Sequence, residues 1–99
     1  MAYSLTDKLT FESNPEIEVN GIILTVQADA KTVLKVMDAV EKEGEVYAGM
    51  KAAELLFSKK DREKIDSLNL NMQDYGTLIG AAMQLAVGED PDEDTEKKE

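Results

Sequence analysis

The dipeptide Asn20-Gly21 constrains this chain most, because it lies between two short runs in which apolar and polar residues alternate. Asn-Gly is well suited to place two successive residues at positive φ, as a two-residue type I′ hairpin requires. We therefore predict that residues 17–19 pair antiparallel with residues 22–26. Upstream, Leu5, Leu9 and Phe11 are spaced as in an extended segment. Ile23 is an extra apolar residue in the second strand, which suggests that this strand is covered on both faces or lies between neighbours.

Helical periodicity follows the hairpin from residue 30 to residue 88. The pattern predicts helices over about 30–42 and 46–57, a short helix between Ser58 and Leu68, and a last helix from residue 71 to 88. Asp29 and Asn71 are suited to cap the first and last of these helices, and residues 58–61 form a variant capping box. Gly44 and Gly88 are expected to end the first and last helices. The chain is thus predicted to be α+β, with an N-terminal β-hairpin or small antiparallel sheet packed on three to four α-helices.

The hairpin face and the helical stripes predict one core in a single domain over residues 1–88. Its expected members are Phe11, Ile22, Leu24, Val26, Val33, Val36, Met37, Val40, Met50, Ala53, Ile79, Ala82, Met83 and Ala86. Residues 89–99 are rich in acidic residues and are expected to form a disordered tail.

Composition excludes several classes of function. The chain has no Cys and no His, so thiolate chemistry, imidazole catalysis and the common zinc sites lose their usual groups. The net charge is −10, with 11 basic residues scattered among 21 acidic ones, which argues against nucleic acid and anionic membrane surfaces as partners. Apolar runs such as residues 21–24 are far shorter than the roughly 20 residues of a membrane helix. We expect a cytosolic protein that is not an enzyme and has no cofactor.

Two motifs have functional interpretations that the sequence disfavours. Asp90, Asp92 and Asp94 occupy the first alternating positions of a calcium loop, but Thr95 stands where the sharp turn needs Gly, so no metal site is expected. Asp66-Ser67-Leu68 matches the tripeptide in which acyl and peptidyl carrier proteins present their phosphopantetheine serine. In carriers that serine opens a long helix of an all-helical bundle. Ser67 instead follows a predicted hairpin, and residues 69–71 interrupt the helical pattern directly after it.

An apolar surplus indicates a binding surface. Leu55, Leu56 and Phe57 are consecutive, so a single helix cannot turn all three toward one small core. We predict a partner-binding surface made by Leu55, Leu56, Phe57, Ile65, Leu68 and Leu70. The alternative is that the short helix after Ser58 folds back over the three consecutive residues and buries them.

The order of the segments along the chain resembles one family. Leu9-Thr10-Phe11, the hairpin through residues 19–22, the helix from Ala30 to Glu43, and a last helix with Asp74-Tyr75 and residues 78–82 before an acidic end are similar to the tail assembly chaperones of long-tailed bacteriophages, particularly those of phages and prophages of Gram-positive bacteria. The resemblance covers about residues 5–88 and includes no short diagnostic signature.

The resemblance implies a chaperone that binds the long helical tape-measure protein during tail assembly, acts in the cytoplasm of the bacterial host and is absent from the mature virion. It also implies homo-oligomers and, in many members, a longer frameshifted form. Two alternatives stay open: a structural tail or head-tail connector component, and a carrier protein modified on Ser67.

Overall fold

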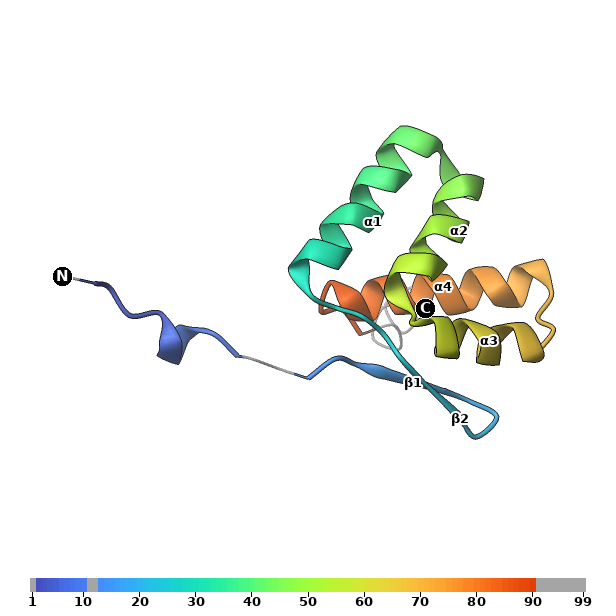
Figure 1. Ribbon diagram of the computed structural model, residues 1–99, viewed down its shortest axis with the longest axis horizontal. Helices are drawn as coiled ribbons and strands as arrows, with labels where there is room; N and C mark the ends of the chain where they lie inside the picture. Colours follow the sequence, from blue (N-terminus) through green and yellow to red (C-terminus); the bar gives the residue numbers. More distant parts are fainter. Residues whose placement is uncertain (1, 11–12, 91–99) are drawn as a thin grey trace, which may run out of the picture.

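A computed structural model describes residues 2–10 and 13–90 of the chain (Figure 1). Its elements in chain order are η1 (Thr6–Lys8), a 3₁₀ turn, then β1 (Glu16–Val19), β2 (Ile22–Thr25), α1 (Ala30–Glu43), α2 (Glu45–Leu56), α3 (Lys59–Ser67) and α4 (Met72–Ala86). In Figure 1 the antiparallel pair α1 and α2 rises above α4, whereas α3 and the hairpin lie below it. The predicted α+β class is confirmed.

The hairpin forms with the predicted turn. Asn20 and Gly21 have φ of 50° and 83°, and Val19 pairs with Ile22 across the turn. The Gly21 N–H donates to the Glu18 carboxylate at 2.8 Å, which adds a side-chain hydrogen bond to the turn. Leu24 is fully buried, whereas Ile23 is 45% exposed. The face of β2 that carries Ile23 is therefore open to solvent, so the prediction that this strand is covered on both faces is wrong.

Helix α3 covers the edge of β2 that β1 leaves unpaired. The Thr25 N–H donates to Asp61 Oδ2 at 2.9 Å, and Lys64 Nζ donates to the Ile23 carbonyl at 3.3 Å. Lys64 Nζ also lies 3.4 Å from Asp61 Oδ1. These two side chains take the place of a third strand, because they satisfy backbone groups that would otherwise form an exposed sheet edge. The second strand thus lies between two neighbours, β1 and α3, which is the second of the two arrangements predicted from Ile23.

Replacing Asp61 with alanine is expected to lower the free energy of unfolding by about 1–3 kcal/mol, because the part-buried Thr25 N–H would lose its acceptor. Urea denaturation followed by circular dichroism would measure the change. Asp61→Asn is the matched variant, since its amide oxygen can still accept this hydrogen bond and should retain part of the stability. Equal stability of Asp61→Ala and the wild type would show that water replaces the carboxylate.

The predicted helix starts are confirmed by their hydrogen bonds. Asp29 accepts from the Thr32 N–H at 3.1 Å, Ser58 from the Asp61 N–H at 3.2 Å, and Asn71 from the Asp74 N–H at 2.7 Å. In each case the cap oxygen satisfies one of the first N–H groups of a helix, which have no partner inside it.

Two glycines end helices as predicted. Gly44 separates α1 from α2 with a φ of 83°. Gly88 follows α4 with a φ of 88°, and its N–H donates to the Leu85 carbonyl at 3.1 Å. A positive φ of this size strains residues that carry a side chain, so glycine suits both positions.

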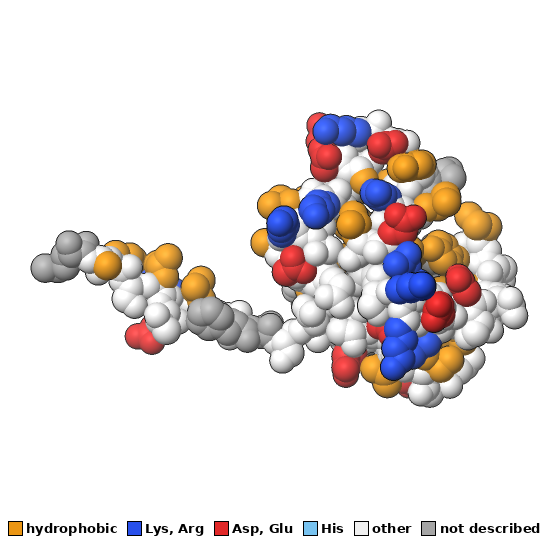
Figure 2. All heavy atoms as spheres, in the orientation of Figure 1, with side chains coloured by type: hydrophobic (Ala, Val, Ile, Leu, Met, Phe, Trp, Pro, Cys, Tyr) orange, Lys and Arg blue, Asp and Glu red, His pale blue; other side chains and the backbone are white. Residues whose placement is uncertain are grey.

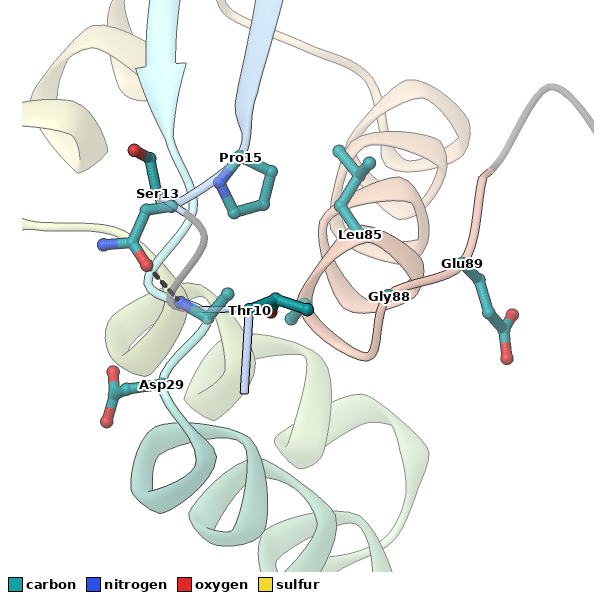
Figure 3. A pocket seen from close by; sticks show the side chains of 10 residues that line it. Thr10, Ser13, Pro15, Asp29, Leu85, Gly88 and Glu89 are labelled. Carbon is teal, nitrogen blue, oxygen red and sulfur yellow. Dashed lines mark hydrogen bonds between the residues drawn. The ribbon is translucent and has the colours of Figure 1, made fainter. Parts of the chain in front are cut away.

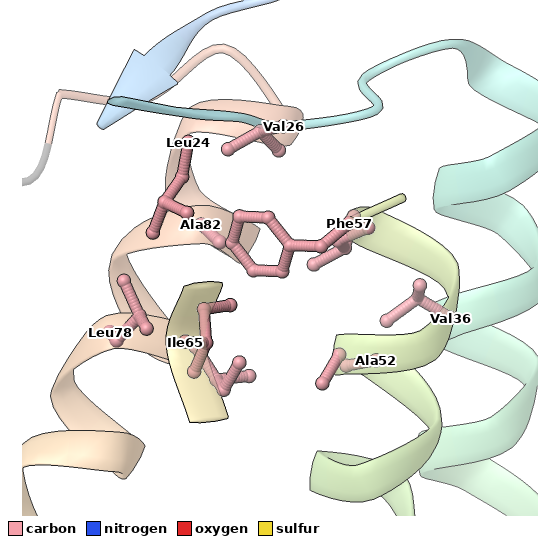
Figure 4. Close-up of a cluster of buried hydrophobic side chains, with 11 residues drawn as sticks. Leu24, Val26, Val36, Ala52, Phe57, Ile65, Leu78 and Ala82 are labelled. Atoms are coloured by element: carbon pink, nitrogen blue, oxygen red, sulfur yellow. The ribbon is translucent and has the colours of Figure 1, made fainter. Parts of the chain in front are cut away.

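The core lies where α2 meets the hairpin and α4. Helices α1 and α4 both pack against α2. Figure 4 shows the ring of Phe57 between Leu24 and Val26 on the hairpin side and Ala82 of α4. The buried hydrophobic cluster comprises Leu24, Val26, Val36, Ala52, Ala53, Leu56, Phe57, Ile65, Leu78, Ile79 and Ala82.

The predicted core is partly wrong. Met37, Val40 and Met50 are 54%, 40% and 60% exposed. Helix α1 packs through Val36 and Ala39, which lie on a neighbouring part of its surface, so Met37 and Val40 remain outside. Leu24, Val26, Val36, Ala53, Ile79 and Ala82 are buried as predicted, Ile22, Val33, Met83 and Ala86 are half-buried, and Phe11 lies outside the described residues.

The N-terminal segment differs from the expected extended run. Residues 6–8 form the η1 turn, and Lys8 Nζ donates to the Tyr3 hydroxyl at 2.6 Å. Tyr3, Leu5 and Leu9 are 74%, 49% and 52% exposed, and the segment projects away from the helices (Figure 1). The acidic tail predicted for residues 89–99 lies outside the described residues beyond Asp90.

Candidate functional site

The surface predicted from the apolar surplus is largely internal. Leu56 and Phe57 are each 1% exposed and Ile65 is 4% exposed, so the prediction that they form an accessible surface is wrong. Leu55, Leu68 and Leu70 are half-buried, and Leu55 and Leu70 pack against the core.

Consecutive residues can share the core here because α2 ends at Leu56. Phe57 has extended backbone dihedrals, φ −123° and ψ 142°, so its side chain leaves the helical pattern and turns into the core. Ile65 of α3 closes over the same cluster, as the alternative interpretation of the apolar surplus required.

A groove on the other side of α2 has the exposed apolar lining that a binding surface needs. It holds about 650 Å³ and lies where α1, α2 and α4 meet. We call it the methionine groove and define it by its lining residues, Val40, Ala48, Gly49, Met50, Met72, Tyr75, Gly76, Ile79, Gly80 and Met83. Figure 2 shows hydrophobic side chains gathered over α2 and above the first half of α4. A recess of about 20 Å³ that shares Met83 continues the apolar lining toward Val33, Met37 and Val87.

The lining is chemically suited to a variable apolar partner. None of the ten residues that define the groove is charged. Met50 and Met72 are 60% and 79% exposed, although each could bury its side chain against a partner. Methionine is unbranched and polarizable, so it adapts to differently shaped partners and is common at promiscuous binding surfaces. The groove can thus bury apolar surface of a partner.

Acidic groups lie near one part of the groove wall. Burial raises the pKa of the Tyr75 hydroxyl, and the neighbouring carboxylates of Asp66 and Glu54 raise that pKa further. Glu54 also pairs with Lys51 at 3.8 Å, but both side chains are about half exposed, and such ion pairs contribute little to the free energy of unfolding. The carboxylates of Asp66 and Glu54 near Tyr75 favour a cationic group on a partner at this part of the wall.

A second hollow, of about 530 Å³, lies between the base of the N-terminal segment and the end of α4 (Figure 3). Two of its polar side chains, Asn14 and Asp29, make hydrogen bonds within the fold. Asn14 Oδ1 accepts from the Ala28 N–H at 3.2 Å, and the Asp29 carboxylate accepts from both the N–H and the hydroxyl of Thr32. The pKa of Asp29 is lowered chiefly by these bonds to Thr32. We therefore place the candidate site in the methionine groove.

Ser67 lies where a carrier serine would not. It is the last residue of α3, and its hydroxyl donates to the Lys64 carbonyl at 2.6 Å. A phosphopantetheine serine in the carrier pattern would instead open a long helix.

The described residues contain no group of three or more His, Cys, Asp or Glu that could hold a metal ion. Of the three aspartates in the calcium pattern, Asp92 and Asp94 lie outside this part of the chain. Within the described ranges, no helix is long and apolar enough to cross a membrane.

A sequence signal for the methionine groove exists, although part of it also fits a core stripe. Met50 was predicted to lie in the core because it continues an apolar stripe. Met72, Gly76, Gly80 and Met83 follow helical spacing along α4, and this stripe marks the exposed wall of the groove. Comparison with known protein families, curated proteins and solved structures found no match for the chain.

Proposed function

We propose that this protein is a phage or prophage tail assembly chaperone that binds and solubilises the tape-measure protein in the cytoplasm of the bacterial host. The observation that supports this role best is the methionine groove, an exposed apolar surface on a small, strongly acidic protein. A groove of this kind suits the apolar face of an amphipathic helix, which inserts side chains at positions i, i+3, i+4 and i+7. A tape-measure protein before tail assembly is a long helical client of that type.

The acidic character of the chain fits the same role. A net charge of −10 keeps a protein soluble while it holds an apolar client, because complexes of like charge repel one another. The lack of Cys and His supports a binding role without catalysis. Under this proposal the protein binds no nucleic acid, several copies coat one client, and the mature virion lacks the chaperone.

Co-expression with the tape-measure protein tests the proposal. The longest open reading frame beside this gene would be expressed with and without the chain, and its soluble fraction measured after centrifugation. We expect the client to remain soluble and to co-purify only when this chain is present. A client whose solubility and binding are independent of the chain would contradict the proposal, and detection of the chain in purified particles would favour a structural tail component instead.

A further inference from the structure

We propose that the methionine groove selects a cationic amphipathic helix, one that carries Lys or Arg beside its apolar stripe, rather than a second copy of this chain. This inference rests on the proposed function and specifies the chemistry of the client segment. Three features support it: the glycines in the groove wall, the length of that wall, and the charges around it.

The glycines make the α4 backbone accessible from the groove. Gly76 and Gly80 lie inside α4 and are exposed. Each is less favourable in a helix than alanine by about 1 kcal/mol. Apart from the chain neighbours and the backbone of α4 itself, a Cβ atom at either position would meet no atom within 4 Å, so no packing contact in the described part of this chain requires glycine there. A partner helix could approach the bare backbone more closely than the usual 8–10 Å between helix axes.

The wall is long enough to contact several turns of a helix. Met72 and Met83 stand eleven residues apart on α4, roughly 16 Å along the helix axis at about 1.5 Å per residue. The anchors of a bound helix from i to i+7 span about 10 Å by the same rise. Methionines therefore flank the glycines at both ends, and a helix lying along the wall would bury its apolar stripe against all four residues.

The charges favour a cationic partner over a second copy. Tyr75 lies in the groove wall within the fields of Asp66 and Glu54. A second copy would bring the same carboxylates as part of another net charge of −10, whereas a helix with Lys or Arg beside its stripe would place opposite charges there. Such attraction acts within about 8 Å at physiological salt, so it weakens as salt is added.

Two designed peptides would test the proposal against the full chain. Both are 20-residue helices with leucine at the i, i+3, i+4 and i+7 positions, and one carries Lys where the other carries Glu. Isothermal titration calorimetry should show that the Lys peptide binds at least about tenfold more tightly, a difference of about 1.4 kcal/mol, and that this preference shrinks at high salt. The double variant Glu54→Gln, Asp66→Asn should reduce the preference.

Substitutions at Gly80 show whether the peptide lies in the groove. Gly80→Leu fills open space and should weaken binding of the Lys peptide by at least about tenfold, whereas the smaller Gly80→Ala should have a much smaller effect. Both variants should melt no lower than the wild type, because alanine and leucine favour helix more than glycine does.

Equal affinity for the two peptides, or unchanged binding in Gly80→Leu, would overturn this inference. Tight self-association of the free chain that Gly80→Leu abolishes, measured by light scattering, would also overturn it in favour of a second copy. The proposed function is tested separately by co-expression, so a client that stays soluble with the chain while the peptides fail to discriminate would refute only the present inference.

Discussion

Replacing Phe57 with alanine is expected to lower the free energy of unfolding by about 3–5 kcal/mol. The side chain is 1% exposed and lies between the hairpin, α3 and α4, so its removal leaves a cavity that several elements would have to move to fill. A domain of this size is stabilised by only about 5–15 kcal/mol, so the loss is a large fraction of the total. Urea denaturation followed by circular dichroism at 222 nm would measure it.

Tyr47→Ala is the matched control for Phe57→Ala, because Tyr47 is an aromatic residue of α2 that is 49% exposed and outside the hydrophobic cluster. Its effect should stay within about 0.5 kcal/mol, as for most surface substitutions. If Phe57→Ala proved as mild as Tyr47→Ala, the placement of Phe57 at the centre of the core would be wrong. Phe57→Asp would bury an unpaired carboxylate, and we expect that variant not to fold.

The double variant Met50→Asp, Met72→Asp should abolish binding of the tape-measure client while the chain stays folded. Both side chains are exposed, so the substitutions remove no core contact, and an acidic residue at the first position of α4 suits the helix dipole. Two carboxylates in the groove would be desolvated by the apolar stripe of the client helix, which is unfavourable. Co-expressed client should therefore move from the soluble fraction to the pellet, while circular dichroism of the variant matches the wild type.

Leu34→Asp and Tyr47→Asp control for this experiment. Leu34 in α1 and Tyr47 in α2 are 64% and 49% exposed and lie outside the groove lining, so each adds a charge to an exposed apolar position without touching the groove. Both variants should keep the client soluble. Client lost equally with the controls would show that added charge alone impairs binding, and client retained by the Met50 and Met72 variant would exclude the groove as the binding surface.

The hairpin and the helix ends could be predicted because a few neighbouring residues determine them. Asn20-Gly21 adopts positive φ at both positions, and Asp29, Ser58 and Asn71 each accept a hydrogen bond from an N–H three residues on. These interactions are local, so their signature appears in the sequence itself. The α+β class and the order of the elements follow from them.

The sequence did not correctly predict which apolar residues lie in the core and which lie on the surface, because burial is not a local property. The stripe of α1 includes Val33, Val36, Met37 and Val40, and it is wider than the contact that α1 makes with α2. Periodicity shows that such a stripe exists, but not which part of it a neighbouring helix will cover. The interpretation of Leu56 and Phe57 failed because it treated both as helical, whereas the chain turns at Phe57 and directs the ring inward.

The sequence by itself determined the turn, the caps, the class of fold and the strongly acidic character of this protein, since each depends on composition or on residues close together in the chain. Only the tertiary structure decided that α2 lies between α1 and α4, that α3 covers both the edge of β2 and the predicted surface, and that Met50, Met72, Gly76 and Gly80 border an open groove. Burial depends on contacts between distant segments, and several arrangements of the same amphipathic helices would satisfy the same local pattern.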